Sequence, residues 1–541
     1  MSIGYKQLIT RFLGEIPLTA EFYFQFKKNN EPGTRYSLKN LKARLPKMLP
    51  EIEAGRRTTE NPKKILVFTS LHYWIEEAAT LALYFAATGH DVTFGYLPYA
   101  DWQNPVNKFD VRKQDLYTRS VLDSTQKYMK LHSFMPSFPS YKAFPEEISA
   151  IADEVATYDT QYTLQVEDFD KDNALYKMRR ERNETFAKLL YNWIQANHPD
   201  QVIVPNGTIQ EMGVAYRVAK WLGIPVTTYE FGEQRKRIWI AQNREVMRQE
   251  TDDLWAVRKD ALATDGDLEK VRSMFNARQK ADLWENFSRR WQGSDRVGQE
   301  KIREALGLDD RPVVFLATNV LGDSLTLGRQ TFSRNMAEWI ERTIQYFLER
   351  TDAQLVIRVH PGEQFTHGTS MVDVVEALSP NLPSHIHLIT PTDKTNSYDL
   401  VDIATVGLVY TTTMGLEMAM SGVPVVVAGQ THYRNRGFTY DPTSWVTYYK
   451  MVSSILDDPE KSALTSEQVY LAWAYAYSFF FEYPRPFPWH LVRMWDDYDK
   501  RPFASVLSDE GQAEYGASFN YLLGEPMDWA KILTLESGKA A

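Results

Sequence analysis

The run Tyr410–Glu417 (YTTTMGLE) combines three consecutive threonines with a glycine and a carboxylate. A strand is expected to end at Tyr410 and a helix to follow, so free N–H groups and the positive end of a helix dipole would lie beside the threonine hydroxyls, which fits a phosphate. These threonines are Thr411, Thr412 and Thr413. Gly415 would let a ligand or backbone approach closely, and Glu417 would hold ribose hydroxyls. The alternative is a helix N-cap with spare threonines.

A second motif, Arg358-Val359-His360-Pro361-Gly362-Glu363, follows an apolar run. Strand alternation places Arg358 and His360 on one face, near the carboxyl end of a parallel strand, where open α/β sheets bind ligands. An imidazole there can donate to a phosphate oxygen or stabilise a departing one. The alternative is a histidine that packs at the strand end.

Candidate acceptor groups follow three earlier strands. His72 comes after the first strand, and Asn206 and Glu211 come after a later one. Glu230 and Glu233 follow the next strand and are candidates for a general base or for acceptor-binding carboxylates. Ordinary polar loops at strand ends are the alternative for all of these positions.

Two blocks of alternating strands and helices must position these residues, which predicts two Rossmann-like α/β domains. The expected strands are 64–70, 91–97, 201–204 and 225–229 in the first block, and 312–318, 354–359, 385–389, 406–410 and 424–428 in the second. We expect a helical arm over 1–60, an acceptor domain over 61–300, a nucleotide-sugar domain over 301–460 and C-terminal helices over 461–541 that cross back to the first domain.

Composition excludes several classes of protein. The 541 residues include 61 Lys and Arg, 70 Asp and Glu, and no cysteine, which excludes disulfides, cysteine-ligated metals and thiol nucleophiles. Neither a membrane span nor a signal peptide is recognisable, and the net charge of −9 disfavours nucleic-acid binding. We therefore expect a cytoplasmic protein.

The N-terminal arm differs from the rest of the chain. Residues 1–57 carry eleven Lys and Arg against five Glu, and they include Phe12, Phe22, Tyr23, Phe24 and Phe26. A basic, aromatic arm can contact an anionic membrane surface, which would place the protein peripherally at the inner face of the membrane. The alternative is a solvated helical extension that packs on the main body.

The ordered motifs from His360 to Tyr440 resemble the bacterial capsule polysaccharide biosynthesis proteins, a group that includes Kdo transferases. The resemblance begins with His360-Pro361 and the helical motif SYDLVD, which starts at Ser397. It continues with the threonine turn and Gly415-Leu416-Glu417, then with the run GVPVVV from Gly422, and it ends in an aromatic loop. That loop contributes Tyr433, Gly437, Phe438 and Thr439.

This resemblance implies a GT-B architecture, in which two Rossmann-like domains face a cleft, and a metal-independent glycosyltransferase that needs no cofactor. It implies that His360, Thr412 and Thr413 bind the donor phosphate and that Glu417 holds the donor ribose. The expected substrates are a nucleotide-sugar, with Kdo or another acidic sugar on CMP as one option, and a glycan or glycolipid acceptor. Around Glu230 the sequence departs from the family pattern. The alternatives are a nucleotide-sugar epimerase or hydrolase on the same fold, and a non-catalytic glycan- or nucleotide-binding assembly factor.

Overall fold

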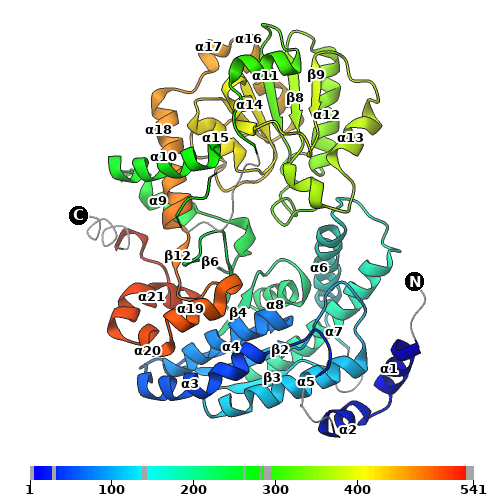
Figure 1. The fold of residues 1–541 in the computed structure, drawn as a ribbon, viewed down its shortest axis with the longest axis vertical. Helices are drawn as coiled ribbons and strands as arrows, with labels where there is room; N and C mark the ends of the chain where they lie inside the picture. Colours follow the sequence, from blue (N-terminus) through cyan, green and yellow to red (C-terminus); the bar gives the residue numbers. More distant parts are fainter. Residues whose placement is uncertain are drawn as a thin grey trace. The chain divides into compact units, whose positions relative to one another are not determined.

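The computed structural model describes residues 5–26, 32–136, 143–259, 263–280, 282–285 and 294–531. Contacts divide the chain into two compact units. Unit 1 comprises 1–159, 171–247 and 485–527, and unit 2 comprises 160–170, 248–484 and 528–541. Each unit contains one sheet flanked by helices, so the two Rossmann-like domains expected from the sequence are confirmed (Figure 1). Their facing arrangement stays a prediction.

The sheet of unit 1 has seven strands in the order β12-β6-β5-β4-β1-β2-β3. Its parallel strands are β1 (Lys64–Ser70), β2 (Asp91–Leu97), β3 (Lys130–Ser133), β4 (Gln201–Pro205) and β5 (Val226–Glu230). The chain extends the sheet from β1 towards β3 and then returns to add β4 and β5 on the other side of β1. The order therefore reverses between β1 and β4, and a crevice at the carboxyl ends of strands is expected at such a point.

An antiparallel edge completes this sheet, which the sequence analysis did not foresee. β6 (Arg237–Gln242) turns back along β5, and β12 (Arg485–Pro486) pairs with β6. We did not predict this strand because it begins in a basic run. Ile238 and Ile240 nevertheless alternate inward, as a half-buried strand requires. The hairpin between β5 and β6 fixes the position of Glu230, the last residue of β5.

Helices cover both faces of this sheet, and the expected helical arm is confirmed. The arm contains α1 (Tyr5–Glu15), α2 (Thr19–Phe26) and α3 (Lys39–Gly55). The helices of the body are α4 (His72–Ala87), α5 (Lys108–Leu122), α6 (Glu146–Leu164), which continues into unit 2, α7 (Ala174–Asn197) and α8 (Gln210–Trp221). Of the segment 461–541 that we expected to cross back, residues 485–527 lie in unit 1, with α19 (Met494–Lys500), α20 (Phe503–Val506) and α21 (Asp509–Leu522), whereas residues 461–484 lie in unit 2. Figure 1 shows α3 and α4 side by side, and α20 packs against α3.

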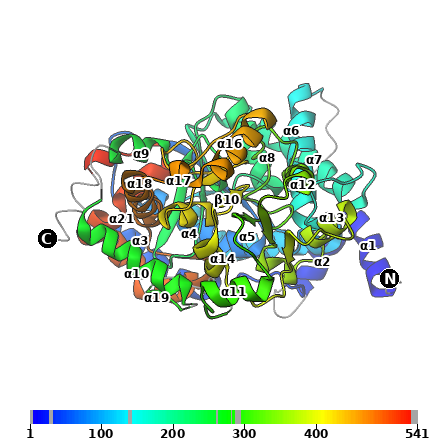
Figure 2. The same ribbon diagram turned by 90° about the horizontal axis from the view of Figure 1, so that it is seen from above.

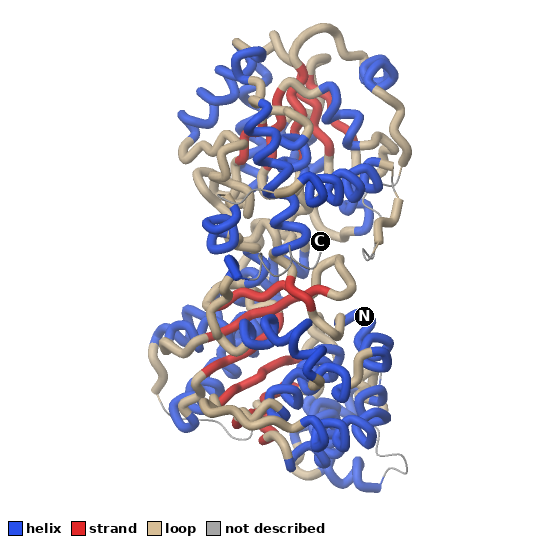
Figure 3. Tube along the Cα trace, turned by 90° about the vertical axis from the view of Figure 1, so that its left-hand side faces the viewer, coloured by secondary structure: helices blue, strands red, loops and turns tan. Residues whose placement is uncertain are grey.

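Unit 2 contains a five-stranded parallel sheet in the order β11-β10-β7-β8-β9. Its strands, drawn in red in Figure 3, are β7 (Val313–Ala317), β8 (Gln354–Arg358), β9 (Ile386–Ile389), β10 (Val406–Val409) and β11 (Val425–Val427). Nearly every side chain in these strands is buried, as expected for a sheet covered on both faces. Here the order reverses between β7 and β10.

Unit 2 also contains the charged helical segment that follows residue 260. The helices of unit 2 are α9 (Asp252–Arg258), α10 (Asp265–Gln279), α11 (Gln299–Leu306), α12 (Met336–Glu349), α13 (Met371–Leu378), α14 (Ser397–Ile403), α15 (Met414–Met420), α16 (Trp445–Asp457), α17 (Pro459–Ser462) and α18 (Ser466–Tyr477). α10 lies beside α18 (Figure 2). Residues 248–300, which we expected in the first domain, therefore belong to unit 2.

The aromatic run after α18 packs inside unit 2. Phe479, Phe480 and Phe481 are all buried, as are Tyr475 and Tyr483. Within the described ranges, the helices are too short or too polar to cross a membrane.

Candidate functional site

The loop after β7 organises the carboxyl edge of the sheet in unit 2. The Thr318 hydroxyl accepts a hydrogen bond from the backbone N–H of His360 at 3.0 Å. The Asn319 side-chain oxygen accepts one from the backbone N–H of Thr411 at 3.1 Å. The two motifs singled out in the sequence are therefore fixed to the same loop, at the point where the strand order reverses. Neither Thr318 nor Asn319 was predicted as a site residue.

The imidazole of His360 is exposed at this edge. Its Nδ1 accepts a hydrogen bond from the backbone N–H of Gly362 at 3.0 Å. Because an accepting Nδ1 carries no proton, the neutral ring carries its proton on Nε2. His360 can therefore donate a hydrogen bond from Nε2–H to an anionic oxygen.

The three threonines differ in their roles. The hydroxyl of Thr411 is buried and has no hydrogen-bond partner among the described residues. Thr412 accepts a weak hydrogen bond from the N–H of Met414 at 3.3 Å. Thr413 occupies the N-cap position of α15, but its side chain makes no cap hydrogen bond. The ordinary N-cap alternative therefore does not account for the Thr413 hydroxyl. Because α15 has only seven residues, these hydroxyls offer more to an anion than its dipole does.

Tyr433 stabilises the threonine turn and packs against Gly415. Its hydroxyl donates a hydrogen bond to the carbonyl oxygen of Thr412 at 2.6 Å. A Cβ atom on Gly415 would lie 2.4 Å from that hydroxyl and 2.9 Å from a methyl group of Val409. Gly415 is thus required by the protein's own tyrosine, which occupies the space that the sequence analysis gave to a ligand or to backbone.

Glu417 lies beneath the turn and is 4% exposed. One carboxylate oxygen accepts from the Arg278 guanidinium, and the other accepts from the Tyr398 hydroxyl at 2.8 Å. Arg278 comes from α10 and lies 4.6 Å from the centre of the Phe480 ring. The carboxylate therefore joins α10, α14 and α15, and both of its oxygens are used within the protein. No spacing rule links positions 278 and 417, so this pair could not be predicted from the order of residues.

Arg358 is also turned inward. It is 4% exposed, and its guanidinium donates to the carbonyl oxygens of Thr390, Asp393 and Thr395. Burial lowers the pKa of Arg358. Arg358 thus orders the loop that follows β9, whereas His360 faces solvent.

In unit 1, the structure brings Asn206 and Glu230 together at the carboxyl edge of the sheet. The Asn206 amide donates to the Glu230 carboxylate at 3.1 Å, and the Phe231 N–H donates to its other oxygen at 3.0 Å. Burial raises the pKa of Glu230 and outweighs these two hydrogen bonds. A carboxylate with a raised pKa is a stronger base, which suits proton abstraction near neutral pH.

The other candidates of unit 1 have different surroundings. His72 begins α4 at the end of β1, and its Nδ1 is buried without a partner in the described structure. Burial lowers the pKa of His72. Glu211 is 2% exposed and accepts from Arg182 at 2.8 Å. Burial alone would raise the pKa of Glu211, but the neighbouring arginines lower it overall. Glu233 is half-buried in the turn between β5 and β6.

A further carboxyl group, Glu77, is buried beside this edge. It lies in α4, is 1% exposed, and accepts a hydrogen bond from the Tyr229 hydroxyl at 2.6 Å. Burial raises the pKa of Glu77 to about 8, and the charge of Glu230 contributes in the same direction. Glu77 is therefore mostly protonated at neutral pH. Sequence analysis missed it because it lies within an apolar helical run.

Among the residues whose placement is described, no group of three or more His, Asp or Glu side chains is arranged to hold a metal ion. The functional chemistry that the described edges can offer is hydrogen bonding by hydroxyls and an imidazole in unit 2, and proton transfer by a carboxylate in unit 1.

The raised pKa of Glu77 makes stability depend on pH. Folded Glu77 keeps its proton to about pH 8, whereas the ordinary value is 4.5, so the free energy of unfolding should fall as pH rises between these values. Glu77→Gln removes this titration and should make the decline shallower, as measured by urea unfolding between about pH 5 and 8. Glu147→Gln, on the exposed side of α6, serves as the control. An unchanged slope in Glu77→Gln would show that the folded protein does not hold this proton.

Comparison with known proteins finds one family match, and it falls within unit 2. Residues 273–451 match the family described as capsule polysaccharide biosynthesis protein. This region covers a third of the chain and includes His360, the threonine turn and Tyr433. No curated protein matches.

Among solved structures, similarity extends to the KpsC beta Kdo 2,4 transferase of Thermosulfurimonas dismutans. The two are 15% identical over 54% of this chain and 82% of that chain, with a TM-score of 0.34. The UDP-GlcNAc 2-epimerase of Neisseria meningitidis bound to UDP-GlcNAc is 12% identical over 78% of this chain and 99% of that chain, with a TM-score of 0.25. Similarity at this level carries no argument about activity. The family match over residues 273–451 thus includes His360, Thr412 and Tyr433 and makes this part of unit 2 similar to capsule polysaccharide biosynthesis proteins.

Proposed function

We propose that the protein is a glycosyltransferase of capsule polysaccharide assembly, which transfers a sugar from a nucleotide-sugar to a glycan or glycolipid acceptor. The observation that carries the proposal is the joint attachment of His360 and Thr411 to the loop after β7. It fixes an imidazole donor and a hydroxyl-rich turn at the strand-order reversal of a unit whose sequence matches the capsule family.

In this mechanism the donor phosphate binds at the carboxyl edge of unit 2. The Nε2–H of His360 and the hydroxyls of Thr412 and Thr413 stabilise the negative charge that develops on the leaving phosphate as the bond to the anomeric carbon breaks. These groups provide that stabilisation without a metal ion, and no cofactor is required. CMP carrying Kdo or another acidic sugar is one donor that fits the family resemblance.

Unit 1 supplies the base. Glu230 accepts the proton of the acceptor hydroxyl, and Asn206 and the Phe231 N–H orient its carboxylate. Glu233 is the second candidate for this role, and His72 and Glu211 remain candidates for acceptor binding. Of these two, His72 is the better supported, because both Glu211 and its Arg182 partner are nearly buried.

Two residues of the proposed donor site are assigned a positioning role. Glu417 and Arg358 use their charged groups to hold helices and loop carbonyls around the site. Glu417 could bind donor ribose only if one of its carboxylate oxygens gave up its present partner for a sugar hydroxyl. We therefore assign it to positioning the donor-binding groups and not to contacting the donor.

The N-terminal arm supports a peripheral location at the inner face of the membrane. Three phenylalanines of α1 and α2 are strongly exposed: Phe12 is 69% exposed, Phe22 57% and Phe26 83%. Exposed aromatic side chains in a segment of net positive charge suit the interface of an anionic bilayer.

Nucleotide binding tests the donor site. Of CMP, CDP, UDP and GDP, at least one should raise the thermal midpoint, since a ligand at a hundredfold excess over Kd adds about 2.7 kcal/mol to stability. Thr413→Val should lose this shift while the unliganded midpoint stays the same. Thr351→Val, at the opposite edge of the sheet, should retain it. No shift with any nucleotide in the wild-type protein would rule out the donor-site assignment.

Replacement of His360 tests the chemistry. His360→Ala should lower the rate of nucleotide release by roughly 10²–10³-fold, because one donor to the developing charge is lost. His367→Ala, at an exposed histidine of the same unit, should not change the rate. Release that requires acceptor indicates a transferase, and release without acceptor indicates a hydrolase or an epimerase. Normal turnover in His360→Ala would remove this residue from the mechanism.

Vesicle sedimentation tests the arm. The protein should sediment with vesicles that contain phosphatidylglycerol and remain in solution with pure phosphatidylcholine, because anionic lipid attracts the basic arm. Replacing Phe12, Phe22 and Phe26 by serine should abolish sedimentation. Phe365→Ser, at an equally exposed position of unit 2, is the control. If the triple variant sediments like the wild type, the arm is not the membrane contact.

A further inference from the structure

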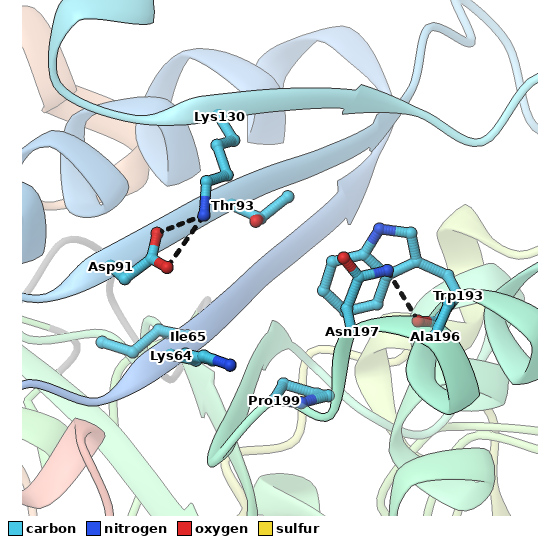
Figure 4. A pocket seen from close by; sticks show the side chains of 9 residues that line it. All are labelled: Lys64, Ile65, Asp91, Thr93, Lys130, Trp193, Ala196, Asn197 and Pro199. Atoms are coloured by element: carbon cyan, nitrogen blue, oxygen red, sulfur yellow. Dashed lines mark hydrogen bonds and ion pairs between the residues drawn. The ribbon is translucent and has the colours of Figure 1, made fainter.

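A pocket lies at the amino ends of β1, β2 and β3, on the edge of the unit 1 sheet opposite His72 and Glu230. It encloses about 200 Å³ and is lined by residues of these strands and of the last turn of α7 (Figure 4). Ile65 and Thr93 belong to the strand side, and Trp193 and Asn197 face them from the helix. The catalytic and acceptor-binding roles assigned so far to the sheet of unit 1 use only its carboxyl edge, so this pocket has no assigned role.

Trp193 gives the pocket an aromatic wall. The side chain is half-buried, and its ring lies 6.0 Å from that of His132 and 6.2 Å from that of Phe134. These contacts hold the indole from one side while it lines the pocket on another. A flat apolar surface of this kind suits the C–H face of a sugar ring, because it buries apolar area without requiring a hydrogen-bond partner.

Polar groups surround this wall. Lys130 forms an ion pair with both oxygens of Asp91 at 2.8 Å. Asn197 donates from its amide to the carbonyl oxygen of Trp193 at 2.8 Å, which leaves the amide oxygen available to accept. The Lys64 side chain is exposed and forms no ion pair within the described structure. The rim thus presents both donors and acceptors, as the hydroxyl groups of a sugar require.

The charges around the pocket argue against a strongly anionic ligand. Asp91 pairs with Lys130, and the Asp200 carboxylate accepts from the backbone N–H of Lys64 at 2.7 Å, which places a second acid beside the second lysine. In addition, the C-terminal end of α7 carries the negative end of a helix dipole. A nucleotide phosphate is therefore disfavoured, whereas a hydroxyl-bearing ring is not.

We propose that this pocket binds a pyranose unit of a glycan, with the ring face on Trp193 and the hydroxyls on Asn197, Asp91 and Lys64. This inference rests on the proposed function, since the glycan would be the acceptor chain or its product. β1 runs for seven residues from Lys64 to Ser70, and at about 3.3 Å per residue its two ends lie roughly 20 Å apart. The pocket therefore holds a sugar several units from the reacting one, and it favours long acceptors over short ones.

Ligand-observed NMR with the full chain tests the site, using two neutral hexasaccharides of different linkage, maltohexaose and laminarihexaose, as probes. At least one hexasaccharide should bind, and Trp193→Ala and Asn197→Ala should each weaken binding by about tenfold or more. Trp221→Ala, at another partly exposed tryptophan of unit 1, should bind like the wild type. Absence of binding of both probes at about 10 mM would overturn the inference. Binding that both pocket variants retain, or that CMP or UDP displaces, would also overturn it.

The nucleotide shift, measured in the same variants, separates this inference from the proposed function. Trp193→Ala and Asn197→Ala should retain the shift, because their side chains lie in unit 1 at the edge away from the carboxyl ends of its strands. A nucleotide shift without binding of either sugar would refute the pocket alone. Sugar binding that depends on Trp193, in a protein that binds no nucleotide, would refute the transferase and leave a glycan-binding site.

Discussion

The candidate site of unit 2 depends on the reversal of strand order between β7 and β10. At that point two adjacent parallel strands send their chains to opposite faces of the sheet, so the edge between them is not covered by a connection from either strand. Thr318 and Asn319 lie at this position and bond to the backbones of the two neighbouring loops. These two bonds fix the backbone at the start of both motifs, and the Tyr433 hydroxyl adds a third bond to the threonine turn.

Buried charged side chains near the exposed edge link segments of unit 2 that are distant in sequence. Glu417 is buried and forms hydrogen bonds with Arg278 and Tyr398. Arg358 is also buried and donates to carbonyl oxygens of the loop after β9. Isolated charges in such places would be strongly destabilising, but these are paired or hydrogen-bonded. Because each connects segments distant in sequence, they hold the loops in place for binding. Carboxylates and guanidinium groups near a site thus need not contact the ligand.

Much of the fold could be predicted, because buried parallel strands are short runs of apolar residues, as in β7 and β10. β6 escaped prediction because its first residue continues a basic run and its burial depends on the helices that pack on it. At the site, local spacing led to the threonine turn and to His360. It could not reveal Asn319, Arg278 or Glu77, whose roles come from contacts across the fold. We expected Gly415 to make room for a ligand or for backbone, yet a tyrosine from a later loop occupies that space.

The contact between Gly415 and Tyr433 has a consequence for how the sequence can vary. The missing Cβ and the tyrosine hydroxyl share one volume, so neither position can be altered independently of the other. A larger residue in the helix requires a shorter ring substituent in the loop, and a smaller loop residue leaves a void and an unpaired carbonyl oxygen at Thr412. Among related chains the two positions should therefore vary as a pair.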